Sequence, residues 1–234
     1  MSQFSSSREQ AFAKLFHATA EKYQQGRQKA SGLLDAEGKA FLSSIGYTEE
    51  EFFDFVEDYT GIVGEAVRWC RKAADDGDPC AQSDLGGIYA NGIRVARDYA
   101  QAAFWYHKAA AKGNVRAQSG LGYLYTNGLG VAQDYAQAAF WNHKAADKGD
   151  VSAQSGLGYL YANGLGVAQD YVQAAFWYQK AAEKGSDFAQ LYLGYQYESG
   201  QGVPHDHALA LFWFRKASDQ GNAQAREELE KSLC

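Results

Sequence analysis

Five histidines and several aspartates are the residues of this chain that could bind a metal or transfer a proton. His205 and His207 flank Asp206, so one short segment offers two imidazoles and a carboxylate, which are zinc ligands. No further cluster of ligand-type residues accompanies them, and a protein zinc site normally has three or four protein ligands. The sequence therefore predicts no metal site and no cofactor.

The other titratable residues are kept apart by their spacing. His107 and His143 are 36 residues apart, and so are Asp134 and Asp170. Helices that stack on each other lie about 8–10 Å apart, too far for two imidazoles to share a metal directly unless the side chains converge. We expect the two histidines to be solvent-facing polar residues on an outer helix, and the aspartates to begin helices.

The motifs of covalent and nucleotide chemistry are missing from the sequence. It contains no G-x-S-x-G, S-x-x-K or P-loop motif, and no strand-associated G-x-G-x-x-G. The Gly-Leu-Gly pieces of Asn127–Val131 (NGLGV) are predicted to be turns between helices rather than phosphate cradles. We predict that the protein is not an enzyme; an unrecognised pocket site remains a less favoured alternative.

An internal repeat of 36 residues sets all of these spacings. One column of the repeat holds tryptophan and another holds glycine; the members are Trp69, Trp105, Trp141, Trp177 and Trp213, and Gly77, Gly113, Gly149, Gly185 and Gly221. A repeat of this length is typical of helix pairs that stack into a solenoid. The sequence thus predicts an all-α, right-handed superhelical solenoid of antiparallel helix pairs.

Two helices are expected in each unit, at 81–90 and 98–112 and then at the same positions shifted by 36. Asp134 and Gln137 have the spacing of a capping box at the start of a second helix. Gly122 lies inside a first helix, where it would allow close contact between helices. Phe140 and Trp141 are expected to fill the seam between neighbouring repeats.

These columns resemble the Sel1-like repeat family, whose pattern A-x-x-x-LG-x-x-Y-x-x-G-x-GV-x-x-D-x-x-x-A-x-x-W-x-x-x-AA-x-x-G runs through residues 62–233. Full units are 81–116, 117–152, 153–188 and 189–224, with partial units on either side. The resemblance implies a tetratricopeptide-like right-handed superhelix and a role as an adaptor in protein complexes. Arg94 departs from the pattern, because a loop glycine is expected there.

Residues 1–61 do not repeat and are assigned to a separate segment, followed by the solenoid at 62–234. Helices are expected at Ser7–Tyr23 and Leu33–Ile45, and an acidic helix at Glu49–Asp58 begins with a capping box. The segment is interpreted as a helical cap over the first repeat, since solenoid ends must be covered. An independent docking module that uses the acidic helix is the alternative.

The net charge and the cysteine content limit the classes of partner and the cellular compartment that we expect. The chain of 234 residues has a formal net charge of −6, which disfavours a nucleic-acid partner. It shows no secretory signal and no long apolar run, so no membrane insertion is expected. Three cysteines without a regular pairing fit reduced thiols, and a cytoplasmic location is predicted. The oligomeric state is left open.

The function predicted from these features is a scaffold or adaptor that binds a protein or an extended peptide in the concave groove of the solenoid. A neutralising or regulatory partner of one enzyme or toxin is the main alternative. By similarity to tetratricopeptide units, the first helices should line the groove. The candidate residues are Arg116, Ser119, Tyr123, Thr126, Asn127, Ser155, Tyr159, Asn163, Leu191, Tyr195 and Glu198.

Overall fold

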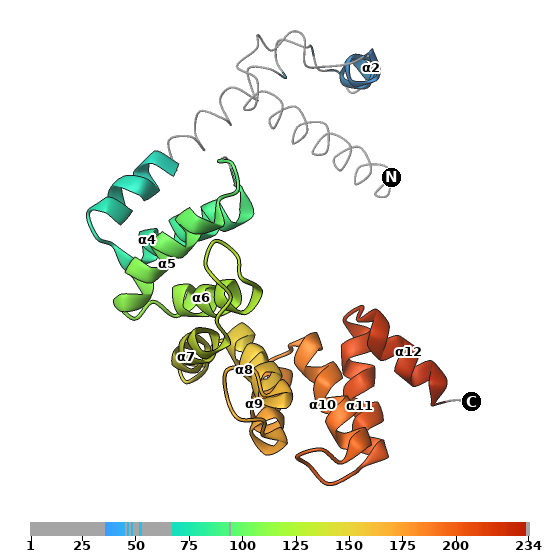
Figure 1. Ribbon diagram of the computed structural model, residues 1–234. Coiled ribbons are helices and arrows are strands. Elements are labelled where there is room, and N and C mark those ends of the chain that lie inside the picture. Colours follow the sequence, from blue (N-terminus) through green and yellow to red (C-terminus); the bar gives the residue numbers. More distant parts are fainter. Residues whose placement is uncertain are drawn as a thin grey trace. The chain divides into compact units, whose positions relative to one another are not determined.

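The structure, a computed structural model, describes residues 36–44, 46, 48, 52, 67–93 and 95–232 (Figure 1). These residues form helices, turns and loops, and none of them is in a strand. The chain divides into two compact units. The first comprises Met1–Lys72 with Gly92–Ala96, and the second comprises Ala73–Asn91 with Arg97–Cys234.

The second unit is a row of helix pairs, each with a short helix-to-helix loop. The first helices of the pairs are α4 (Pro79–Asn91), α6 (Val115–Asn127), α8 (Val151–Asn163) and α10 (Asp187–Ser199), and α12 (Ala223–Lys231) begins a further pair. The second helices are α5 (Tyr99–Ala111), α7 (Tyr135–Ala146), α9 (Tyr171–Glu183) and α11 (His207–Asp219). Successive first helices begin 36 residues apart, so the predicted all-α solenoid with this period is confirmed.

The first unit is described only in part. Helix α2 (Ala36–Ser44) lies within the helix expected at Leu33–Ile45, and Leu42 and Phe52 are buried. The expected helices at Ser7–Tyr23 and, apart from Phe52, at Glu49–Asp58 lie outside the described residues. Residues 67–75 are helical and continue from the first unit into the second.

Aspartates begin the second helices, but not by the full capping box. The Asp134 carboxylate accepts hydrogen bonds from the backbone N–H groups of Ala136 and Gln137, at 2.9 and 3.0 Å. In a capping box the Gln137 side chain would bind the Asp134 N–H in return. That N–H instead donates to the Tyr125 carbonyl oxygen at 3.1 Å. The reciprocal half of the predicted box is therefore replaced by a backbone bond from the preceding helix.

The turn between the two helices of a pair also contacts the preceding repeat. Gly130 has φ +66°, and a Cβ at this position would overlap the backbone of Tyr99, the first residue of α5. Gly166 lies against Tyr135, and Gly202 against Tyr171, in the same way. The glycine thus provides both a left-handed backbone and the space for close approach.

The row of helix pairs curves because its two layers pack differently. Each first helix contacts the next first helix, α4 with α6, α6 with α8 and α8 with α10, whereas contacts between successive second helices are weaker. The first helices therefore form the inner face of the curve and the second helices form the outer face. Figure 1 shows α4 to α12 following one another along this row.

Small and aromatic residues fill the seams between repeats. Trp105, Trp177 and Trp213 are buried, as predicted for their column, while Trp141 is half-buried. Trp177 packs on alanines of α7 and on Leu157 of α8, so it reaches back to the preceding repeat, whereas Trp69 of the same column is 68% exposed. The prediction that Phe140 fills the seam is wrong, because its side chain is 47% exposed. It lies on the outer face, one position away from the buried stripe of α7.

Candidate binding face

Three inner helices, α6, α8 and α10, carry the predicted groove residues, and these residues differ widely in exposure. Arg116, Tyr123, Asn127, Asn163 and Glu198 are exposed, while Ser119, Thr126, Tyr159 and Tyr195 are half-buried. Ser155 and Leu191 are buried. The structure therefore places most of the set on or near the surface of the inner helices, and binding by them remains a prediction.

Leu191 and Ser155 are corrections to the predicted set. Leu191 belongs to a core cluster with Ala210 and Phe214, so its side chain has no surface to offer a partner. The Ser155 hydroxyl lies 3.0 Å from the Ser186 hydroxyl and donates to the Val151 carbonyl oxygen. Ser155 is covered where α8 meets the beginning of α10, and Leu191 is covered by α11 and by Ala225 of α12.

The three tyrosines of the predicted ladder have different surroundings. Tyr195 packs edge-on against Phe214, with ring centroids 5.2 Å apart, and its hydroxyl donates to Glu228. Burial, with Glu228 beside the hydroxyl, raises the pKa of Tyr195. Tyr159 packs against the core cluster that contains Tyr178. Tyr123, in contrast, is 60% exposed, which makes it the most exposed aromatic side chain of the inner helices.

Several polar candidates already form hydrogen bonds or an ion pair within the solenoid. Asn127 Nδ2 donates to the Tyr123 carbonyl oxygen at 2.8 Å, and Asn163 makes the equivalent bond to Tyr159. Each bond closes the last turn of a first helix and leaves the amide oxygen at the surface. Arg116 pairs with Asp84 of the preceding first helix at 2.8 Å, and both side chains are exposed.

Two further candidates bond within or between helices. The Thr126 hydroxyl donates to the Gly122 carbonyl oxygen at 2.8 Å, inside its own helix. The Ser119 hydroxyl donates to the Asp150 carboxylate at 2.9 Å, which joins α6 to the beginning of α8. Only the Ser119 bond helps to hold neighbouring first helices in register.

The histidines are not the solvent-facing residues that the sequence predicted. His107 Nε2 lies 3.1 Å from the Tyr125 hydroxyl, and its ring packs edge-on against Trp141. His143 lies 3.0 Å from the Tyr161 hydroxyl, with its ring against Trp177. Both are half-buried between repeats, and burial lowers the pKa of His107. A tyrosine hydroxyl of the next repeat faces each of these two histidines.

Metal binding finds no support in the described part of the chain. Within it, no three or more His, Cys, Asp or Glu side chains gather as a metal site would require. His207 Nδ1 lies 2.8 Å from Glu198 Oε2, so this histidine joins α11 to the end of α10.

Sequence reasoning missed a stripe of phenylalanines on the outer face. In four successive second helices a phenylalanine is 46–49% exposed and a lysine ammonium lies 4.3–4.7 Å from its ring centre. The pairs are Phe104–Lys108, Phe140–Lys144, Phe176–Lys180 and Phe212–Lys216. The signal was the F-x-x-x-K spacing, which places both residues on one helix face. Each pair is a cation–π contact.

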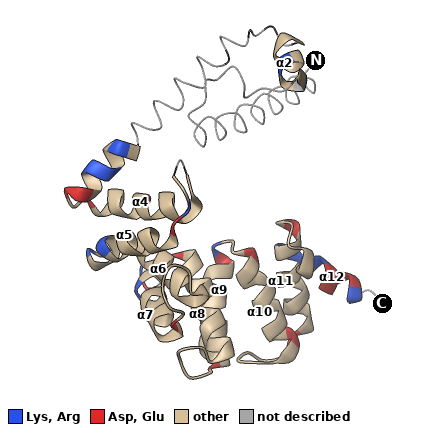
Figure 2. Cartoon of the chain, turned by 45° about the horizontal axis from the view of Figure 1, so that its top comes forward, with Lys and Arg blue, Asp and Glu red and all other residues tan. Residues whose placement is uncertain are grey.

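The middle of the inner face, formed by α6 and α8, is poor in charge. Helix α8 contains no charged residue and is drawn wholly in tan in Figure 2, and α6 contains only Arg116. A nucleic-acid groove would need a basic lining to meet the phosphates. This face instead offers hydroxyl, amide and aromatic groups.

Comparison with known proteins identifies the repeat. The chain matches the Sel1 repeat in five stretches, residues 64–78, 81–114, 115–150, 151–186 and 187–222, which together make up more than half of its length. The chain belongs to the Sel1 repeat family. Sel1 repeats build helical scaffolds for protein–protein interaction, and they are generally not catalytic.

Two solved structures show the extent of the similarity. A protective antigen present in uropathogenic Escherichia coli strains, displaying an SLR fold, is 41% identical with a TM-score of 0.65. A Sel1 repeat protein from Oxalobacter formigenes is 38% identical with a TM-score of 0.62. The matches cover 70% and 71% of this chain, but only 35% and 48% of those two chains. No curated protein matched.

No helix in the described residues is both long enough and apolar enough to cross a bilayer.

Proposed function

We propose that this Sel1 repeat chain is a non-catalytic adaptor that binds an extended segment of a partner protein along its inner face. The observation that carries the proposal is Tyr123, a large aromatic side chain 60% exposed on an inner helix. Tyrosine combines apolar area with a hydroxyl group and is common among interface hot spots. Exposed Asn127 and Asn163 lie on the same series of helices and present amide oxygens.

The low charge of α6 and α8 supports a protein segment over a nucleic acid. Arg116 is the single basic residue of α6 and α8, and it already pairs with Asp84. A partner that inhibits or is inhibited by this chain, such as an enzyme or a toxin, would use the same face.

A photo-crosslinking experiment tests this proposal. A benzophenone amino acid is placed at Tyr123 on the inner face or, as the matched control, at Phe140 on the outer face. Both side chains are exposed aromatics, so both sites should accept the probe without loss of fold. We expect a partner to be crosslinked from position 123 and not from position 140. Crosslinking from position 140 alone would move the binding surface to the outer phenylalanine stripe.

Two other parts of the proposal concern compartment and the first 61 residues. Cys80 is an exposed thiol, in keeping with a reducing compartment such as the cytoplasm. Counting reactive thiols in protein taken directly from cells tests the proposed compartment.

Residues 1–61 are proposed to cap the solenoid or to dock a second protein. Removing these residues and measuring the melting temperature tests whether they cap it.

A further inference from the structure

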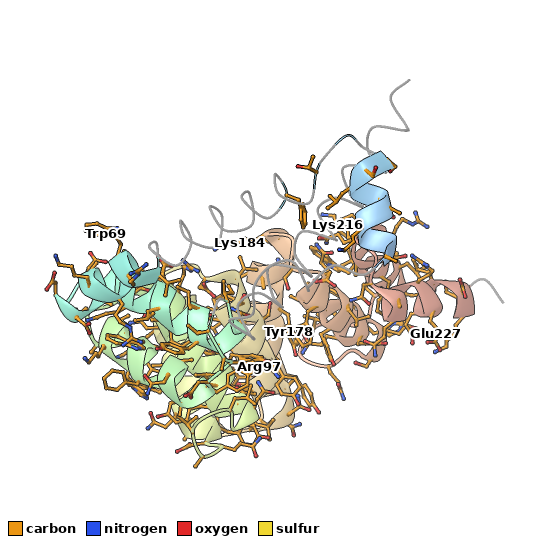
Figure 3. All side chains as sticks on the ribbon, turned by 90° about the horizontal axis from the view of Figure 1, so that it is seen from above. Trp69, Arg97, Tyr178, Lys184, Lys216 and Glu227 are labelled. Atoms are coloured by element: carbon orange, nitrogen blue, oxygen red, sulfur yellow. The ribbon has the colours of Figure 1, made fainter. Side chains whose placement is uncertain are left out.

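One seam between inner helices differs from the others in the residue that fills it. In three repeats an aromatic ring of the second helix lies between neighbouring first helices, namely Tyr106, Tyr178 or Phe214. Tyr106 lies between Gly86 and Gly120, so close that a Cβ on either glycine would overlap its ring. Tyr178 lies against Gly158 and stacks on Tyr192 with ring centroids 5.6 Å apart (Tyr178 is labelled in Figure 3).

Between α6 and α8 the equivalent residue is Asn142. Its side-chain amide lies between two glycines, Gly122 of α6 and Gly156 of α8, and we call this place the α6–α8 seam. Asparagine is far smaller than tyrosine, and both flanking residues lack a side chain. The seam is therefore the place on the inner face where the aromatic filling is interrupted.

The Asn142 amide is buried and makes no hydrogen bond within the described part of the chain. Its side chain is 4% exposed, and no hydrogen bond joins its amide to any residue that the structure describes. An amide can donate two hydrogen bonds and accept two. Leaving such a group without partners costs free energy, so buried amides normally find them. Unlike the sealed Gln118 Oε1, the atoms of the Asn142 amide keep some contact with solvent.

Tyr123 provides a second, independent observation at the same place. Its equivalents Tyr159 and Tyr195 pack on the clusters of Tyr178 and Phe214, the aromatic residues of their own repeats. With asparagine at position 142, no aromatic ring among the described residues packs against Tyr123. This accounts for its 60% exposure, while Tyr159 and Tyr195 are half-buried. Tyr123 directly follows Gly122 in α6, so an aromatic ring without an aromatic partner is one residue along the chain from the glycine that the Asn142 amide contacts.

We propose that the α6–α8 seam is a subsite that binds a main-chain amide of an extended peptide. The Asn142 amide would form the hydrogen bonds, and Tyr123 would contact the peptide. A side-chain amide can donate to a peptide carbonyl oxygen and accept from a peptide N–H at once. The absence of charge on α8 calls for an uncharged stretch of ligand. The inference rests on the proposed function and adds to it the place and the chemistry of recognition.

The key variant is Asn142→Tyr, which restores the aromatic filling. The ring has room, because Gly122 and Gly156 flank it as Gly86 and Gly120 flank Tyr106. We expect the melting temperature to rise, since more apolar area is buried, while peptide binding weakens at least about tenfold. A gain in stability with a loss of binding cannot come from misfolding. If Asn142→Tyr lowers the melting temperature, the near-isosteric Asn142→Leu takes its place with the same expected loss of binding.

The probe is a phage-displayed library of linear peptides of about nine residues. At about 3.3 Å per residue, this length spans three inner helices spaced about 10 Å apart. Peptides selected on the wild-type protein are synthesised and titrated against four proteins by fluorescence anisotropy. These are wild type, Asn142→Tyr, Tyr123→Ala and the outer-face control Phe140→Ala. Binding should weaken for the first two variants only, and the side-chain NH₂ resonances of Asn142 should shift when peptide is added.

The outcomes separate the inference from the proposed function. If selected peptides bind Asn142→Tyr as tightly as wild type and the Asn142 resonances do not move, the seam only holds water and the inference is overturned, while the adaptor function stands. If the wild-type protein selects no linear peptide, the peptide-binding function and the subsite both fail. If Phe140→Ala is the variant that loses binding, the outer face is the binding surface.

Discussion

The imidazole of His107 shows how a single polar residue can be built into a seam between repeats. It faces the Tyr125 hydroxyl and the Trp141 ring of the next repeat. Burial lowers its pKa from the ordinary value of 6.5, because the ring is partly removed from water and its charged form is therefore disfavoured. The folded protein therefore binds this proton less readily than the unfolded chain does.

This pKa shift predicts how stability depends on pH. Above about pH 6.5 His107 is neutral in both states and the folded state keeps its full stability. As the pH falls through 6.5 toward the lower folded pKa, the unfolded chain takes up the proton first and stability declines. His107→Gln, which copies the residue Gln179 of a later repeat, should reduce the decline. Urea unfolding at several pH values measures this, and an unchanged slope would show that other groups cause it.

At the scale of the helix, caps and loop glycines fix where each element begins and turns. Asn114, Asp150, Ser186 and Asn222 each accept a hydrogen bond from the N–H group three residues ahead, at 2.8–3.2 Å. Such caps stabilise helices by about 1 kcal/mol each. Gly128 and Gly130 both have positive φ, but only Gly130 lies against the backbone of another repeat.

This difference between the two glycines leads to a paired prediction. Gly128→Ala should cost about 1–2 kcal/mol, since alanine resists a left-handed backbone. Gly130→Ala adds an overlap with the Tyr99 backbone, so the loop or α5 must move and the loss should be clearly larger. Chemical denaturation of both variants gives the comparison. Equal losses would mean that the loop can shift away from the preceding repeat at little cost.

The sequence predicted those features that recur in every repeat. The tryptophan column, the helix-initiating aspartates and the turn glycines recur at the same register, so the helix pairs and their boundaries could be read to within about two residues. Features that depend on the neighbouring repeat were missed. Leu191 is buried against α11 and Ala225 of the next repeat, and His107 faces Tyr125 of the next repeat, contacts that the pattern of a single unit does not show.

The candidate site was predictable to a smaller extent, for a related reason. Tyr123, Tyr159 and Tyr195 occupy one column, yet their exposure depends on the residue at a second column. That second column holds Tyr106, Asn142, Tyr178 and Phe214, and the replacement of an aromatic residue by asparagine at position 142 was visible in the sequence. Its meaning required the structure, which shows that the aromatic column lies between the inner helices.

Across the whole solenoid, each repeat is held mainly by the one before it. Lys148 and Lys184 at the ends of second helices donate to the carbonyl oxygens of Gly113 and Gly149, at 2.9 and 2.8 Å (Lys184 is labelled in Figure 3). Gln118 and Gln154 donate from the inner helices to carbonyl oxygens of the preceding second helix. In an array built from such nearest-neighbour contacts, stability is a sum of terms within and between repeats.

Loss of one seam should therefore destabilise the repeats on both sides of it. Trp177 is 5% exposed and packs on Ala145 and Ala146 of α7 and on Leu157 of α8. Trp177→Ala should cost about 3–5 kcal/mol, as is usual for truncation of a buried aromatic side chain. Trp69, which is 68% exposed, provides the control, and Trp69→Ala should cost about 0.5 kcal/mol or less. Hydrogen exchange should show reduced protection in α6 and α7 as well as in α8 and α9, because the cluster joins these helices. If protection falls in α9 alone, the repeats fold more independently than their shared tryptophan contacts imply, and the solenoid would be a string of separate helix pairs rather than a cooperative array.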